Sequence, residues 1–502
     1  MRILTRAYAE AAGCGILAAA AGVAVAELAA TLLRPESSPV IGIGSAVVDA
    51  TPTPVKEYAV RTVGTYDKPL LLAGIVTVLL VVAAGLGLLA RRRRRTGQAG
   101  FAALGLAAAA AVLTRPATEP RDVLPSLLAG AVGALILGWL TAAAAATEVA
   151  GEGNQSRRKF LLTAGAIAGV SVAAGGLTTL VRRSLAGSAA RSRDAITLPA
   201  PTQPAGPRIT TPGFYTPVGE FYRVDTALTV PRVDVDRWRL RIHGLVDRPT
   251  TLDFDELLSL GLVERDITLN CVSNEVGGPY IGTTRWLGLL LAPLLREAGV
   301  HPDADQVVAR SVDGMTLGTP TATLLDGRDA MLAVGMDGSP LPPEHGFPVR
   351  MLTPGLFGYA GSCKWITELE LARFGDFDAY WVRRGWARQA PVKTASRIDR
   401  PAAFAKVPPG DVTIAGVAWA QGRGISAVEL QVDDGPWEQT DLLPSPSRDT
   451  WVQWRHQWHA ARGGHTLRVR ATDGTGRTQP EQRATPFPDG ATGWHTLAVT
   501  VT

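Results

Sequence analysis

Three short stretches of the sequence contain residue types that can bind a metal or a charged small molecule. The first is Thr268-Leu-Asn-Cys271, in which a cysteine ends a β-like run. A cysteine thiolate is a soft ligand that suits a sulfur-rich transition-metal site, and the thiol must lose its proton to bind. A single cysteine is more often a buried, inert side chain. Cys271 therefore indicates a metal site only together with other residues.

The second stretch places an imidazole and two cations close together in sequence. His345-Gly-Phe-Pro-Val-Arg350 is followed by a Pro-Gly turn and then by Lys364 and Trp365. Guanidinium groups bind phosphate through two parallel hydrogen bonds, and glycine allows close backbone approach because it has no side chain. Each residue alone is compatible with ordinary surface charge. The whole string is typical of a site for an anionic cofactor.

The third stretch, Phe221-Tyr-Arg-Val-Asp225, places Arg223 and Asp225 two residues apart. In a strand, two such side chains share one face. Taken alone, the pair is more typical of a surface ion pair than of a site.

A mixed α+β domain over about 212–400 is expected to position these residues. Apolar and polar residues alternate over 238–244, which predicts a strand, and helical spacing over 254–260 and 287–298 predicts helices. Interleaved strands and helices of this kind are typical of α+β folds.

A boundary between this domain and the next is expected at Pro401 to Asp411. Beyond it the sequence pattern is typical of an all-β domain. The run 425–432 ends in Asp-Asp-Gly, a hairpin signal, and the alternating run 465–471 is followed by another turn. We therefore predict an immunoglobulin-like β-sandwich over 401–502, although the Cys-Trp-Cys pattern of antibody domains is missing.

Residues 1–182 predict a membrane anchor, joined to the soluble part by a linker over 183–211. Apolar stretches that approach the roughly 20 residues needed to cross a bilayer lie at 10–33, 69–90, 99–114, 124–147 and 160–181. The third stretch is the weakest, because Arg115 and Pro116 end it early. Four or five transmembrane helices are expected.

Positive charge predicts which side the soluble part occupies. With five spans, three basic clusters lie on the cytoplasmic side: Arg2 with Arg6, Arg91 to Arg95, and Arg157 to Lys159. The catalytic part is then extracytoplasmic in a multi-pass protein of the cell membrane. Four arginines count against this orientation: Arg182, Arg183, Arg191 and Arg193. The run 156–161 also resembles a twin-arginine export signal, or is simply the basic flank of a span.

Composition excludes several classes of protein. The formal charge of +5 is small for 502 residues and its clusters flank apolar runs, which argues against nucleic-acid binding. Three cysteines, at 14, 271 and 363, do not form a disulfide scaffold. The membrane part has no His and no Met after Met1, so paired His or Met ligands for a haem are excluded there.

The motifs in the soluble part resemble the sulfite oxidase family. The resemblance rests on 331–350 with Lys364-Trp365, on the region of Cys271, on 286–295, and on Gly416-Val-Ala-Trp419 and Gly493-Trp-His495 in the tail. It covers roughly 212–500, with the motifs in the same order.

This resemblance implies a molybdenum–molybdopterin cofactor. Cys271 would be the protein ligand to molybdenum, beside the dithiolene of the pterin. The residues implied in binding the pterin and its phosphate, or in lying near them, are Arg223, Asp225, Asn274, Asp313, His345, Arg350, Lys364 and Trp365. Asp225 stands where sulfite oxidases usually carry His, and Asp313 is the weaker candidate. The β-sandwich would correspond to the domain through which the family forms homodimers.

Two departures from the family concern the substrate. Sulfite oxidases typically follow the cysteine with Gly-Asn-Arg-Arg, whereas this chain has Ser273-Asn-Glu-Val276. A carboxylate in place of cations disfavours a doubly charged anion. Trp386 falls where a tyrosine is usual, while Arg383 and Arg384 retain the capacity to bind an anion.

The sequence thus predicts a membrane-anchored, extracytoplasmic molybdenum oxidoreductase that couples oxygen-atom transfer to a two-electron change in a small-molecule substrate. A sulfoxide or N-oxide reductase on the same cofactor, and a non-catalytic binding module held at the membrane, are the alternatives. No haem-attachment Cys-x-x-Cys-His is present, so a separate protein is expected to carry the electrons.

Overall fold

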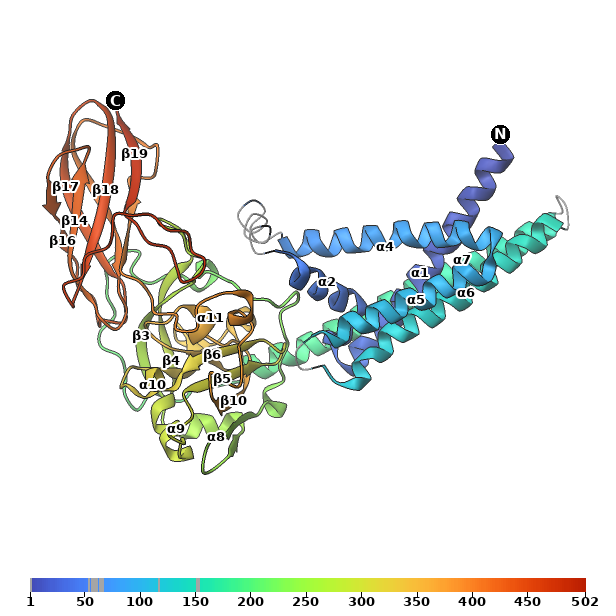
Figure 1. Cartoon of the computed structure of the whole chain (residues 1–502), viewed down its shortest axis with the longest axis horizontal. Coiled ribbons are helices and arrows are strands. Elements are labelled where there is room, and N and C mark those ends of the chain that lie inside the picture. Colours follow the sequence, from blue (N-terminus) through green and yellow to red (C-terminus); the bar gives the residue numbers. More distant parts are fainter. Residues whose placement is uncertain (1, 53–54, 56–61, 63–66, 116–117, 150–153) are drawn as a thin grey trace. The chain divides into compact units, whose positions relative to one another are not determined.

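The computed structural model describes residues 2–52, 55, 62, 67–115, 118–149 and 154–502. The chain divides into two compact units (Figure 1), which are described separately. One comprises residues 1–188 with 227–229, and the other comprises 189–226 with 230–502.

The first unit is helical. Its described α-helices are α1 (Arg2–Leu33), α2 (Pro39–Ala50), α4 (Asp67–Arg92), α5 (Arg94–Leu113), α6 (Leu124–Val149) and α7 (Asn154–Asp194). Short 3-10 turns, η1 (Pro35–Ser37) and η3 (Pro120–Val123), precede α2 and α6. Five stretches in the described residues are long and apolar enough to cross a membrane. They are Ala7–Leu33, Lys68–Arg92, Arg94–Leu113, Pro120–Ala145 and Arg158–Asp194.

Glycines allow these helices to pack closely. A Cβ atom added to Gly15 on α1 would lie 1.9 Å from the carbonyl oxygen of Ala83 on α4. One added to Gly105 on α5 would lie 2.8 Å from the Cα of Gly130 on α6. Small residues at helix contacts are the usual means of packing apolar helices whose surroundings offer no hydrophobic driving force between them. Glycines at these contacts therefore have a structural role, whereas others in the same helices, such as Gly74, have open space beside them.

The ends of α1 and α7 are joined by polar contacts. The Arg182 guanidinium forms an ion pair with Glu27 on α1, and its Nε donates to Thr31 Oγ1 at 3.1 Å. Arg182, one of the arginines that counted against the predicted orientation, thus has its charge compensated within this unit.

Two sheets form the first half of the second unit. The strands of one, in the order β2-β1-β10-β5-β6, are Thr250–Leu252, Leu240–Gly244, Ile366–Ala372, Gln306–Ser311 and Thr316–Pro320. Only its β1–β10 pair is parallel. The strands of the other, in the order β3-β4-β7-β8, are Val263–Asn270, Ile281–Leu290, Met331–Met336 and Ser339–Pro340, with β9 (Arg350–Leu352) also paired to β7. A large apolar core that includes Leu240, Trp286 and Leu369 joins the two sheets.

Short helices complete this mixed α/β part: α8 (Phe254–Ser259), α9 (Leu291–Ala298), α10 (Thr321–Leu325) and α11 (Gly358–Gly361). Helix α8 begins at a capping box, in which Asp253 and Glu256 exchange hydrogen bonds with each other's backbone amides. The predicted helix over 287–298 was wrong in its first part, since Leu287 to Leu290 extend β4 and pair with β7. Uniformly apolar runs do not distinguish a buried strand from a buried helix.

The C-terminal part contains two more sheets. The first, in the order β11-β13-β17-β16, consists of Ala395–Arg400, Gly410–Trp419, Val452–Ala460 and Asp441–Leu442. The second, in the order β12-β19-β18-β14-β15, consists of Lys406–Val407, His495–Val501, Gly463–Asp473, Ile425–Val432 and Trp437–Gln439. A separate apolar core that includes Ile414, Trp454 and Val499 lies among these strands. The description of this part as immunoglobulin-like stays a prediction.

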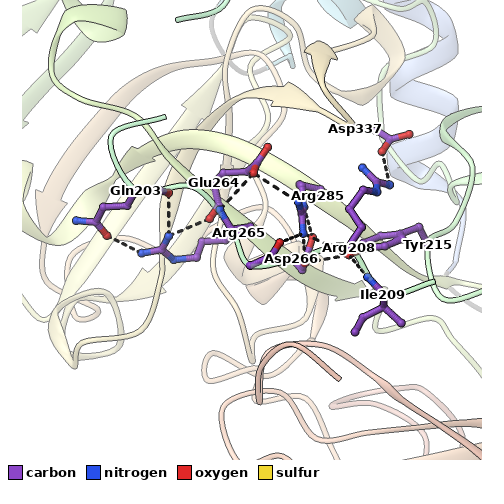
Figure 2. A network of polar contacts seen from close by, with 11 residues as sticks. Gln203, Arg208, Ile209, Tyr215, Glu264, Arg265, Asp266, Arg285 and Asp337 are labelled. Carbon is purple, nitrogen blue, oxygen red and sulfur yellow. Dashed lines mark hydrogen bonds and ion pairs between the residues drawn. The ribbon is translucent and has the colours of Figure 1, made fainter. Parts of the chain in front are cut away.

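Residues 183–211, for which we predicted a linker, are helical as far as Asp194 and then attach to the β3 sheet. Thr202 N donates to Leu262 O at 2.8 Å, and Arg285 Nη2 donates to Gly206 O at 2.8 Å. Figure 2 shows Arg285 aimed at Asp266, whose carboxylate also accepts from Tyr215 Oη. We call residues 202–216 the strap.

Candidate cofactor site

Cys271 directly follows strand β3 and begins the loop 271–280, which we call the cysteine loop. Its backbone amide donates to Tyr280 O at 3.0 Å, and its carbonyl accepts from Asn274 N at 3.1 Å. Asn274 Oδ1 accepts from Tyr280 N at 2.8 Å. Asn274, predicted to contact the cofactor, therefore holds the loop closed through its side-chain oxygen.

The Cys271 thiol is buried, and its ionisation depends on neighbouring groups. Burial raises its pKa, while hydrogen bonds from Ser273 and the positive charge of Lys364 lower it without cancelling the rise. A thiolate at this position needs further positive charge, which a metal ion supplies.

Lys364 and Arg350 are the two buried cations of the site. Lys364 Nζ donates to Asp225 Oδ2 and to Glu344 O, both at 3.0 Å. Burial lowers the pKa of Lys364 to about 8, although Asp225 acts to raise it. The Arg350 guanidinium lies 5.4 Å from the Trp286 ring centroid, and burial lowers its pKa. These cations are fixed in an environment that favours an anionic partner.

Unsatisfied polar atoms lie on Arg350 and His345. His345 Nε2 lies 3.3 Å from Val218 O, whereas His345 Nδ1 and Arg350 Nε are buried with no hydrogen-bond partner in the described part of the chain. Burial and the charges of Arg350 and Lys364 lower the pKa of His345 to about 4. The imidazole is therefore neutral at physiological pH. With Nε2 donating to the carbonyl, Nδ1 is a hydrogen-bond acceptor.

Asp225 connects the front of the domain to these cations. Its Oδ2 accepts from Arg223 Nε and from Lys364 Nζ, both at 3.0 Å. Asp225 is buried and Arg223 is partly exposed. Arg223 and Asp225 form an ion pair, but outside any strand and with the side chain of Asp225 buried, and Asp225 also contacts Lys364, 139 residues away.

Asp313 and Trp365 border the second buried thiol, Cys363. The Asp313 carboxylate accepts from Ser311 Oγ and, at 3.3 Å, from Met315 N. Burial and the charge of Asp313 raise the pKa of Cys363. Trp365 has a positive φ of 52° and its Nε1 donates to Pro343 O at 2.7 Å. Asp313 thus shapes the turn between β5 and β6, and Trp365 fixes the turn that carries His345.

Arg383 and Arg384 lie in the 3-10 turn Val382–Arg384, outside this cluster of cations. Arg384 stacks over the Tyr380 ring at 3.5 Å, and Arg383 is exposed. The neighbouring Trp386 is buried in a second apolar cluster that also contains Val272, next to Cys271. This cluster links the arginine turn to the cysteine loop.

Tyr222 belongs to the site but was not among the predicted residues. Burial and the charge of Cys271 raise its pKa, while Arg350 lowers it to a smaller extent, so the phenol lies close to both groups. The only sequence signal was its position next to Arg223, and an aromatic residue there is equally typical of a core.

Comparisons with known proteins identify the domain that carries these residues. Residues 227–381 match the family described as oxidoreductase molybdopterin binding domain. The mitochondrial sulfite oxidase of Mus musculus is 30% identical over 280 residues, which cover 47% of this chain and 50% of that protein. The nitrate reductase [NAD(P)H] of Hordeum vulgare is 28% identical, over 57% of this chain and 39% of that protein. The chain thus spans about half the length of its sulfite oxidase relatives.

A solved structure shares the fold. The sulfane dehydrogenase SoxCD from Paracoccus pantotrophus aligns with 58% of this chain and 85% of its own, with a TM-score of 0.50 and 22% identity.

The residues of the site fit the cofactor that these comparisons imply. Cys271 is a soft ligand, Lys364 and Arg350 are buried cations, and His345 Nδ1 and Arg350 Nε are a buried acceptor and donor that lack partners. This set suits a polar, anionic group bound through a thiolate. Residues 227–381 are therefore a molybdopterin-binding oxidoreductase domain, related in sequence to sulfite oxidases and nitrate reductases, and its implied cofactor is molybdenum–molybdopterin.

Proposed function

We propose that this protein is a membrane-anchored, extracytoplasmic molybdopterin enzyme that transfers an oxygen atom to or from a small molecule. The proposal rests on one group of residues: Cys271 with the buried cations Lys364 and Arg350. In the same group, Arg350 Nε and His345 Nδ1 lack hydrogen-bond partners. When bound, the cofactor supplies the two-electron redox chemistry.

The protein's contribution is binding and electrostatics. Cys271 provides the thiolate, which Ser273 and Lys364 favour against the effect of burial. Arg350 and Lys364 hold the phosphate and pterin, with His345 as a neutral hydrogen-bonding partner. Tyr222 keeps its proton because burial raises its pKa, so its hydroxyl is a hydrogen-bond donor beside Cys271. It offers the phenolic donor that is missing where Trp386 replaces tyrosine.

The substrate is an uncharged oxide or its reduced form rather than a sulfur dianion. In the cysteine loop, Glu275 and Val276 occupy the positions at which sulfite oxidases typically carry arginines. Arg483 approaches from the segment between β18 and β19, but its Nη2 donates to the carbonyl of Val276 at 3.4 Å. Without those arginines the cysteine loop offers a doubly charged anion no added positive charge, and the exposed Glu275 adds a negative one. This favours a sulfoxide or N-oxide reductase over a sulfite oxidase.

The five apolar helices form the anchor. The basic clusters, including Arg91 to Arg95, lie on the cytoplasmic side. The Arg182–Glu27 ion pair supports the orientation, because it compensates a positive charge on the side assigned to the catalytic part. The run 156–161 serves as a twin-arginine signal. Electrons pass to or from a separate carrier, and the C-terminal sheets, as an immunoglobulin-like domain, support a homodimer.

The decisive experiment is the molybdenum and pterin content of the full chain, matured in a host that makes molybdopterin, beside Cys271→Ser and Cys363→Ser. We expect near-stoichiometric metal and pterin in the wild-type protein and in Cys363→Ser. Cys271→Ser is expected to lose turnover while it stays folded, because only the metal bond is altered. Cys363 is a matched control, since it is a second buried thiol of the same domain.

Three results would contradict the proposal or part of it. Well-folded, properly matured protein without pterin and metal would indicate a non-catalytic membrane module. Full activity of Cys271→Ser, with loss of metal in Cys363→Ser, would show that the other thiol is the ligand. Turnover of sulfite faster than that of dimethyl sulfoxide or trimethylamine N-oxide would reject the preference for an uncharged substrate.

A further inference from the structure

The cysteine loop is fastened by residues of the C-terminal sheets. Within the loop, hydrogen bonds join Cys271 to Tyr280 and Asn274 to Tyr280. The chain turns at Gly277, whose φ of +81° favours glycine. The carbonyls of this turn then face residues of the C-terminal sheets, more than a hundred positions away in sequence.

Arg397, on β11, holds the turn through a charged hydrogen bond. Its Nη1 donates to Gly278 O at 2.7 Å, while its Nε donates to Asp399 Oδ1 at 2.5 Å. The Arg397 side chain is 16% exposed. Since Asp399 fixes one edge of the guanidinium, the other edge is presented to the loop in one orientation.

His495, at the start of β19, fills the space that Gly277 leaves. Its Nδ1 accepts from Ile398 N at 3.0 Å, which assigns the ring proton to Nε2. A Cβ atom added to Gly277 would lie 2.4 Å from His495 Nε2. The β11 strand therefore orients both His495, through Ile398, and the loop, through Arg397.

We propose that Arg397 and His495 are positioning residues that fix the direction of the Cys271 thiol. They touch neither the thiol nor the cofactor residues, and act through the backbone of 277–278, which is closed onto Cys271 by the bonds of Asn274 and Tyr280. Support of this kind around a metal ligand controls its orientation. The inference rests on the proposed function only where it names Cys271 as the metal ligand.

The test uses the full chain produced without molybdopterin, so that Cys271 carries no metal. The rate at which iodoacetamide alkylates Cys271 reports how often the loop opens, and Cys271→Ser gives the background from the other two thiols. Arg397→Met is expected to raise this rate roughly tenfold, because a charged hydrogen bond is lost. Arg397→Lys keeps a donor and is expected to restore most of the protection.

Arg470→Met is the matched control. Arg470, on β18 of the same pair of sheets, donates from Nε to Glu429 Oε2 at 2.8 Å, as part of an ion pair away from the cysteine loop. Its guanidinium also lies over the rings of Trp437 and Trp494, at 4.2 and 5.9 Å, so its loss weakens the sheets up to the residue before β19 but removes no hydrogen bond to the loop. Alkylation that rises equally in Arg470→Met and Arg397→Met would show that Arg397 only stabilises the sheets, and would overturn the proposal.

A second pair of variants tests the contact of His495 with Gly277. Gly277→Ala is expected to open the loop, both through backbone strain and through the clash with His495. Adding His495→Asn, which keeps an acceptor for Ile398 N, is expected to reverse part of that effect. Strictly additive effects of the two substitutions would refute the contact. All of these measurements are made without cofactor, so failure to find molybdenum in the matured protein would leave their outcome intact.

Discussion

At the scale of single residues, the site depends on one carboxylate. Asp225 accepts from both Lys364 and Arg223, and Lys364 is buried. Burying a charge is costly unless an opposite charge accompanies it. In the absence of cofactor, Asp225 supplies that opposite charge, while a bound phosphate adds another close to the same cations.

Asp225→Asn therefore affects the unloaded protein more than the loaded protein. We expect the substitution to lower the free energy of unfolding by about 3 kcal/mol without cofactor, the usual loss when one member of a buried ion pair is removed. With molybdopterin bound, the loss is smaller, because phosphate charge compensates Lys364. Thermal or denaturant unfolding of both forms measures the difference.

Asp303→Asn provides the comparison for this measurement. Asp303 pairs with Arg373 at 2.9 Å, but its side chain is 70% exposed. Its substitution is expected to change stability by less than about 1 kcal/mol in either form. An Asp225→Asn variant that behaved like Asp303→Asn, with and without cofactor, would show that Asp225 does not compensate the buried cations.

At the scale of elements, the strap and the cysteine loop show what long-range contacts add to the domain. The strap is attached by Arg285, which bonds Asp266 through Nε and Nη2, each at 2.8 Å, and also donates to Gly206 O (Figure 2). The same Asp266 accepts from Tyr215. A segment of linker-like composition is thus held in place by a buried ion pair on strands β3 and β4. The strap is therefore held in one conformation by its contacts with the sheet, which its composition alone does not predict.

The contact of β19 with the cysteine loop predicts a specific dependence of stability on pH. Burial, Arg397 and Arg483 lower the pKa of His495 to about 4, from about 6.5 in the unfolded chain. The folded state then binds fewer protons than the unfolded state between these values. Stability is complete above about pH 6.5 and falls as the pH decreases toward 4, by on the order of 2 kcal/mol from this residue.

Denaturant unfolding at a series of pH values measures this effect. His495→Asn is expected to have a smaller loss between pH 6.5 and 4 than the wild-type protein, because one neutral buried imidazole is gone. His345, whose pKa is also lowered, contributes equally in both proteins. His301→Asn, at an exposed position, serves as control. Identical pH profiles for the wild-type protein and His495→Asn would contradict the burial of a neutral His495.

The sequence predicted those parts of the site that are close together along the chain. His345, Arg350 and Lys364 fall within twenty residues, and periodicity predicted the α8 helix and the alternating strands β14 and β18. It did not predict Tyr222, Arg397 or His495, because their roles follow from contacts with the cysteine loop or Arg350 across the fold. Composition also failed to separate strand from helix at Leu287 to Leu290, where every side chain is apolar or glycine.

At the scale of the whole molecule, helix α5 decides on which side of the membrane the proposed topology places the catalytic part. If α5 crosses, there are five spans, and the segment after α7 is opposite to the segment before α1. If it does not cross, four spans bring both to the same side. Helix α5 has 20 residues, which at 1.5 Å per residue gives about 30 Å, the thickness of the hydrocarbon core. Figure 1 shows α5 beside α6, and the near contact of Gly105 with Gly130 agrees with this packing.

We therefore expect five crossings, with Arg91 to Arg95 in the cytoplasm and the catalytic part outside. Alkaline phosphatase, which requires an oxidising compartment to form its disulfides, should be active when fused after Thr502 and inactive when fused after Arg92. Green fluorescent protein does not become fluorescent when it is exported by the general secretory route. Fused after Arg92, it should therefore fluoresce. Leu106→Lys, at a 62% exposed position on α5, should disfavour insertion of α5 across the membrane. It should therefore lower the activity of the phosphatase fused after Thr502. If the phosphatase after Thr502 is inactive in the wild-type chain and protease added to spheroplasts also fails to remove it, the number of spans is even, and the molybdopterin-binding domain lies in the cytoplasm, where the proposed export signal has no use.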